Sequence, residues 1–133
     1  MTNVFKDQEK FMIAGDQTVD KLNNDQYNMY LNLIKEEVDE LHEAVDQNNL
    51  VEQLDALIDI LVVTVGAIHS LGADGEGAWN AVMATNFAKI DPETGKVRKR
   101  EDGKILKPEG WTAPVLEGYL HKPVSSPRIE DVI

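Results

Sequence analysis

The sequence predicts an all-α fold, a bundle in which one helix lies at the centre. Apolar residues recur three and four positions apart in successive segments, which is the pattern of amphipathic helices. One segment, LIDILVVTVGAI (residues 57–68), is apolar almost all round and therefore needs partners on several sides. At 133 residues we expect a single domain, 1–133, with a helical core in residues 1–88 and an extension in residues 89–133.

The expected helices cover residues 4–14, 24–47, 50–71 and 74–88. The first should stop near Gly15, and the second should begin at about Asn24 or have Asp25 as its N-cap. Asn49 can cap the third helix, and Gly72 stands at the position where a left-handed residue commonly ends one. The fourth helix contains two early glycines, so its first residue is 74 or 75.

The extension differs in composition from the helices. The turn signals DPETG and EDGK flank the basic stretches KVRKR and KILK, which predicts a small β-hairpin or an ordered loop. The last part of the chain contains four prolines, and we expect it to wrap the surface or a partner subunit and to fray near its end.

Charge and composition exclude several classes of protein. The net charge of −11 would repel a nucleic-acid backbone, so we expect no nucleic-acid polymer as partner. No apolar run approaches the roughly 20 residues that a membrane span needs, and the N-terminus does not resemble a secretion signal. The chain has no cysteine, which fits a reducing compartment. We therefore expect a cytoplasmic protein without membrane contact.

The basic residues gather in one segment. Residues 89–107 contain seven basic and four acidic side chains, so this segment has a charge of +3 and the rest of the chain −14. An acidic body with a basic flap could bind a phosphate compound through bridging cations together with direct basic contacts.

Carboxylates recur at helical spacing on two successive predicted helices. Three carboxylates of helix 24–47 can converge on one point, namely Glu36, Glu37 and Glu40. Three more lie within about 60° of one another on the next helix, namely Glu52, Asp55 and Asp59. Antiparallel packing of the two faces would gather four or five carboxylates, and their mutual repulsion requires a cation. Because the donors are all hard oxygens, magnesium or manganese suits them better than zinc or copper, and magnesium usually serves phosphate chemistry.

Ordinary structural roles compete with these functional ones. Glu36, Asp39 and Glu43 also fit a solvated helix face. Asp59 stands in an apolar run, where it would be costly unless it bound a cation or contacted a helix end or a partner subunit. Gly66 costs about 1 kcal/mol inside a helix, which suggests the close approach of another backbone or room for a ligand.

Later residues carry the same kind of ambiguity. Asn86 and Lys89 stand three apart at a helix end, where they could bind a phosphate, or the lysine could satisfy the helix dipole. Four aromatic side chains could stack on a base or pack internally: Trp79, Phe87, Trp111 and Tyr119. For Trp79 and Phe87, packing is the preferred prediction.

Taken in order, the motifs resemble a known superfamily. Glu36-Glu37-x-x-Glu40 followed by Glu52-x-x-Asp55 resembles the EExxE…ExxD signature of the all-α nucleotide pyrophosphohydrolases, which include MazG. The stretches ATNFAK and REDGKILKPEGW resemble its MazG-like, phosphoribosyl-ATP-pyrophosphohydrolase-like branch. The similarity extends from roughly Tyr27 to Trp111.

The resemblance implies magnesium-dependent cleavage of a nucleoside triphosphate between its α and β phosphates, giving the monophosphate and pyrophosphate, as in nucleotide-pool sanitation. It implies metal ligands at Glu37, Glu40, Glu52 and Asp55, with Asp59 as a further or supporting ligand. Glu36 would orient or deprotonate the attacking water. The phosphates would be held by Asn86, Lys89, Lys104 and Lys107. It also implies a MazG-like bundle completed by dimerisation, as a homodimer or a dimer of dimers.

Two other functions remain open. One is the hydrolysis of phosphoribosyl-ATP in histidine synthesis, whose substrate has a ribose phosphate in addition. The other is a non-catalytic helical dimer that uses its acidic groove to bind a basic partner.

Overall fold

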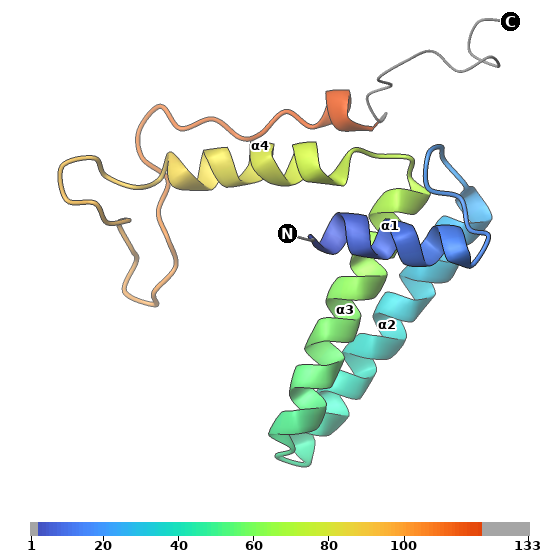
Figure 1. Ribbon diagram of the computed structural model, residues 1–133. Coiled ribbons are helices and arrows are strands. Elements are labelled where there is room, and N and C mark those ends of the chain that lie inside the picture. Colours follow the sequence, from blue (N-terminus) through green and yellow to red (C-terminus); the bar gives the residue numbers. More distant parts are fainter. Residues whose placement is uncertain (1–2, 121–133) are drawn as a thin grey trace, which may run out of the picture. The chain divides into compact units, whose positions relative to one another are not determined.

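The computed structural model describes residues 3–120. It contains four α-helices: α1 (Val4–Ala14), α2 (Asn24–Asp46), α3 (Leu50–Ser70) and α4 (Gly75–Phe87). A short 3-10 helix, η1 (Glu117–Tyr119), follows, and this part of the chain contains no strand (Figure 1). The predicted all-α class is therefore confirmed. The described residues divide into two compact units, one formed mainly by α1, α2 and α3 and the other by Glu76–Tyr119; the predicted single domain stays a prediction.

An asparagine side chain caps the N-terminus of each helix of the first unit. The Asn49 side chain accepts a hydrogen bond from the Glu52 N–H at 3.1 Å, so the predicted cap of α3 is confirmed. The helix α2 begins at Asn24, as predicted; its N-cap is Asn23, so the alternative prediction of Asp25 as the N-cap was wrong. Asn23 has extended backbone angles and accepts from the Gln26 N–H, while its amide donates to Thr18 Oγ1. That second contact, with a residue five positions earlier, fixes the start of the helix.

The helices α2 and α3 form an antiparallel hairpin, and α1 packs against α3 (Figure 1). The core centres on the buried residues Met12, Tyr30 and Ala67, one from each of α1, α2 and α3. His69 is also buried and its Nε2 lies 2.8 Å from the Phe5 carbonyl oxygen, which joins α1 to α3. As predicted, Gly72 follows the end of α3 with a left-handed φ of 73°.

The contact between Tyr30 and Gly66 explains the glycine inside α3. A Cβ atom on Gly66 would lie between 2.3 and 2.7 Å from three atoms of the Tyr30 ring. The predicted reason for this glycine, another backbone or a ligand, was therefore wrong. A side chain of α2 fills the space, and its hydroxyl bonds to Gln17.

In the second unit, α4 leads into an ordered loop. Two isolated antiparallel bridges, Ile90 with Val97 and Lys99 with Ile105, close its turns without forming strands among the described residues. Trp79 and Phe87 are 57% and 60% exposed in this single chain, so the prediction that they pack internally was wrong here. The predicted wrapping and fraying of the final residues falls on 121–133, which lie outside the described part of the chain.

Among the residues that the structure describes, no single helix is long and apolar enough to cross a membrane. The helices α3 and α4 meet the length and composition needed for a membrane span only when they are counted together as one bent pair.

Candidate functional site

The register of the α2–α3 hairpin places carboxylates opposite one another. Glu37 follows Tyr30 by seven residues on α2, and Asp59 precedes Gly66 by seven residues on α3. Seven residues are about two helical turns, or roughly 10 Å along the axis. Because the helices are antiparallel and Tyr30 contacts Gly66, the same step along each helix brings Glu37 towards Asp59.

The environment of Glu37 identifies its neighbours. Its Oε2 atom is shielded from solvent and has no hydrogen-bond partner among the described residues. Burial raises the pKa of Glu37 most. Glu40 raises it further, because its carboxyl can share a proton with that of Glu37 and because of its charge, and the charges of Asp59 and Asp55 add to the shift. The structure thus gathers Glu37, Glu40, Asp55 and Asp59 from two helices around one buried oxygen.

Two predicted site residues are not among the groups that shift the pKa of Glu37. Glu36 is exposed on α2, and Glu52 is exposed in the first turn of α3, where its N–H is held by Asn49. Neither contributes to the shifted pKa of Glu37. Their assignment to the reaction therefore stays a prediction.

The donor chemistry of the cluster fits a hard divalent cation. Four carboxyl groups lie together, and one of their oxygens lacks both solvent and a partner, as expected of a group that binds a cation. In their present positions, however, no three histidine, aspartate or glutamate side chains of the described residues lie close enough to hold a metal ion together. As they stand, the four carboxylates do not form a metal site.

The second unit brings together most of the predicted phosphate-binding residues. The Lys89 ammonium donates to Asn86 Oδ1 at 3.1 Å, so this pair is in contact. The ammonium nitrogens of Lys89 and Lys107 lie over the Trp111 ring, 5.1 and 4.9 Å from its centroid. Sequence reasoning considered Trp111 for base stacking or packing and missed this contact with two lysines.

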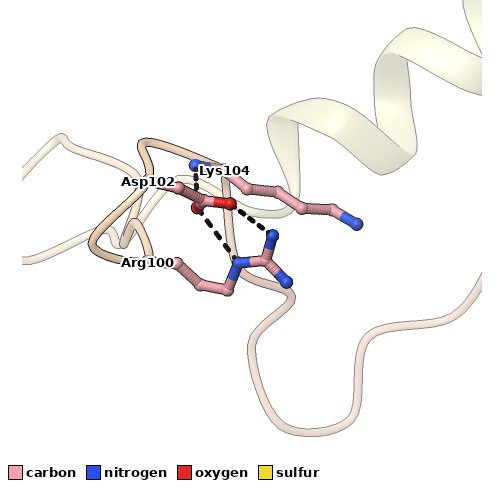
Figure 2. Close-up of polar contacts among 3 residues, drawn as sticks. All are labelled: Arg100, Asp102 and Lys104. Atoms are coloured by element: carbon pink, nitrogen blue, oxygen red, sulfur yellow. Dashed lines mark hydrogen bonds and ion pairs between the residues drawn. The ribbon is translucent and has the colours of Figure 1, made fainter.

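Lys104 belongs to a different turn. Arg100 donates two hydrogen bonds to the Asp102 carboxylate, at 3.1 and 2.6 Å, and the Lys104 backbone N–H donates a third at 3.1 Å (Figure 2). Arg100 first, and then the Lys104 N–H, lower the pKa of Asp102. The Lys104 side chain extends away from this carboxylate (Figure 2). The motif EDGK thus builds a turn and leaves its lysine available.

Comparison with known proteins identifies the family of the chain. Residues 14–86, more than half of the chain, match the model of the family described as phosphoribosyl-ATP pyrophosphohydrolase. An uncharacterized protein of Acanthamoeba polyphaga mimivirus is 42% identical over 62 residues, which are 45% of this chain and 25% of that protein. The chain thus spans about a quarter of the length of this relative. The chain belongs to the phosphoribosyl-ATP pyrophosphohydrolase family, part of the MazG-like all-α nucleoside triphosphate pyrophosphohydrolase superfamily.

Proposed function

We propose that this protein is a magnesium-dependent pyrophosphohydrolase that cleaves a nucleoside triphosphate or deoxynucleoside triphosphate between the α and β phosphates. The products would be the monophosphate and pyrophosphate, and the role nucleotide-pool sanitation. Membership of the family supports hydrolysis of a pyrophosphate bond. The observation that carries the proposal is the buried, unpartnered oxygen of Glu37 among three further carboxylates.

Each acidic residue receives a proposed role. Glu37, Glu40, Glu52 and Asp55 would hold Mg²⁺ or Mn²⁺, and Asp59 would be a further ligand or would orient the others. The bound cation would neutralise charge on phosphoryl oxygens. Glu36 would accept a proton from the attacking water or orient it, a role that suits an exposed carboxylate beside the cluster.

The proposed contacts to the substrate phosphates are Asn86, Lys89, Lys104 and Lys107. The first two already share a hydrogen bond, which orients the lysine. Lysine ammonium groups bind phosphate oxygens through charge-assisted hydrogen bonds. The predictions of a cytoplasmic location and of no nucleic-acid partner stand unchanged.

We also propose that the protein acts as a homodimer or a dimer of dimers. Four leucines at alternating steps of four and three residues are exposed on α3, by 77%, 63%, 51% and 42%: Leu50, Leu54, Leu57 and Leu61. Apolar rows with this spacing form the contact surface, or seam, between helices in bundles. A second copy of α3 is the occupant that this seam fits.

Hydrolysis of phosphoribosyl-ATP is the second candidate function. The description of the matched family favours it. Its substrate contains the same triphosphate chain, so the carboxylate cluster serves both reactions equally. The difference lies in the additional ribose phosphate, which needs its own basic contacts.

The decisive experiment measures pyrophosphate release from a panel of NTPs, dNTPs and phosphoribosyl-ATP, with magnesium and with EDTA. Magnesium-dependent release identifies the substrate class. Glu52→Ala should abolish turnover and weaken magnesium binding while the far-ultraviolet circular dichroism stays unchanged. A folded protein that binds no magnesium and releases no pyrophosphate from any of these compounds would favour the non-catalytic helical dimer.

A further inference from the structure

We propose that Trp111 is a positioning residue that holds Lys89 and Lys107 as one paired binding site for a chain of phosphates. The inference rests on the proposed function, because it takes the phosphate chain of the substrate as the ligand. It adds a residue and an arrangement that the motifs do not contain.

Trp111 is anchored to the end of α4. Its indole Nε1–H donates to the Thr85 carbonyl oxygen at 2.6 Å. In a regular helix the N–H of Lys89 would bond this carbonyl, but that N–H bonds to the Asn86 carbonyl at 3.0 Å instead. The last turn of the helix is tightened, and the indole satisfies the carbonyl that is released. The ring is therefore fixed at the end of the helix from which the Lys89 side chain extends.

The ring brings the two ammonium groups together. The nitrogens of Lys89 and Lys107 lie 5.1 and 4.9 Å from the same ring centroid, so they are at most about 10 Å apart. An indole ring attracts each cation electrostatically through its π face. Lys89 is fixed further by its hydrogen bond to Asn86 Oδ1. These contacts restrict two side chains that otherwise have many rotamers.

The two charges are not neutralised by nearby carboxylates. Among the described residues, no carboxylate forms an ion pair within 4.0 Å with Lys89 or Lys107. Two cations held on one ring repel each other, and an anion that binds both relieves that repulsion. A diphosphate or triphosphate chain has oxygens distributed along its length, so it can reach both ammonium groups at once.

The ring is also accessible. Trp111 borders a cavity of about 350 Å³ that lies between the end of α4 and residues 108–112. Glu109 is the one acidic residue that lines this cavity, and it is exposed. Neither lysine lines this cavity; Lys107 is exposed and Lys89 is half-buried, so an anion would reach the two ammonium groups directly from solvent. If the lysines only covered an apolar ring, their loss would change the packing but not the affinity for phosphates.

The test uses inorganic pyrophosphate and triphosphate in place of a substrate, and EDTA keeps metal absent. Trp79 and Trp111 are the only tryptophans, so Trp79→Phe leaves Trp111 as the sole indole fluorophore. We expect a saturable change in Trp111 fluorescence as either anion is added. Lys89→Met and Lys107→Met should each weaken the affinity about tenfold. Lys96→Met, which removes an exposed lysine of the same basic segment, should leave it unchanged.

Variants at position 111 separate positioning from packing, with binding measured by calorimetry. Trp111→Leu should weaken binding about tenfold, whereas Trp111→Phe, which keeps an aromatic face but not the N–H, should retain a large part of it. With a hydrolysed substrate, Trp111→Leu should raise KM about tenfold with kcat changed less than threefold. Equal affinity of the parent and a folded Trp111→Leu variant would overturn the inference.

The outcomes distinguish this inference from the proposed function. Glu52→Ala should lose hydrolysis and keep metal-free pyrophosphate binding, since it leaves the lysines intact. If the parent protein hydrolyses nothing but binds pyrophosphate through these residues, the proposed function fails and the inference stands. If the parent hydrolyses a triphosphate with unchanged KM in Trp111→Leu, the function stands and the inference fails.

Discussion

The Tyr30 ring of α2 lies in the space that a side chain on residue 66 of α3 would occupy, and Gly66 leaves that space open. This contact fixes the register of the two helices. About two turns from this contact, towards the C-terminus of α2 and the N-terminus of α3, the same register brings Glu37 towards Asp59. The charge of Asp59 contributes to the raised pKa of Glu37. The packing of one aromatic ring on one glycine therefore determines which carboxylates meet.

The first prediction concerns Gly66→Ala. The added methyl group would lie 2.3 to 2.7 Å from the Tyr30 ring, so the ring or one of the helices must shift. We expect the free energy of unfolding to fall by about 2 kcal/mol, because overpacking outweighs the better helix propensity of alanine. Activity should fall as well, since the carboxylates are displaced. Urea denaturation and turnover measure the two effects.

A matched control for Gly66→Ala is Gly15→Ala at the end of α1. There the new Cβ would meet its nearest atom at 3.5 Å, an ordinary contact. This variant should change stability by less than about 0.5 kcal/mol. If Gly66→Ala costs as much in a Tyr30→Leu background as in the parent, the ring is not the cause of its effect.

The second prediction concerns Glu37→Gln. An amide of the same shape removes the negative charge from the buried position and should increase the free energy of unfolding of the metal-free protein by about 1 kcal/mol. Stabilisation by magnesium should be lost in the same variant. Glu43→Gln, at an exposed position of α2, should change neither property. Thermal melts with EDTA and with magnesium report both, and a Glu37→Gln protein still stabilised by magnesium would exclude Glu37 as a ligand.

The third prediction is the pH dependence of stability without metal. The pKa of Glu37 is raised in the folded protein, so the folded state holds this proton more tightly than the unfolded chain. Its contribution to stability is therefore greatest at acidic pH and is lost as the pH rises through the raised pKa. Melting temperatures of parent and Glu37→Gln in EDTA should converge at acidic pH and separate towards neutral pH. Parallel curves across this range would contradict the prediction.

The fourth prediction concerns the exposed leucines of α3. Leu54→Asp with Leu61→Asp places charges in the row of apolar residues that would face a second copy. We expect the double variant to sediment as a monomer where the parent sediments as a dimer or larger. Phe11→Asp changes a 72% exposed residue of α1 and serves as the control. A parent protein that is monomeric at high concentration would argue against the dimer.

Most of the helical fold could be predicted from the sequence because its signals are local. Apolar spacing located four helices, and Asn49 and Gly72 marked the ends of α3 by their own side-chain and backbone chemistry. The start of α2 was correct, but its N-cap was missed, because Asn23 is held by Thr18 and spacing does not reveal that contact.

The site could be predicted only in part, for the same reason. Helical spacing put Glu37 and Glu40 on one face and Asp55 and Asp59 on another, and the structure brings these faces together. The contact of Trp111 with the two lysines depends on the path of a loop between residues 90 and 110, which no periodic pattern describes.

The α2–α3 hairpin has a consequence for how this protein can change over time. The helices α2 and α3 contain both the Tyr30–Gly66 contact and the carboxylates. A change in how these two helices pack therefore also moves the carboxylates. Substitutions that stabilise the protein at this seam would also alter the spacing of the acidic groups. Tolerated variation should therefore accumulate at exposed positions of α1 and in the turns between residues 90 and 105, and a single-residue insertion in α2 between Tyr30 and Glu37 should be among the least tolerated changes.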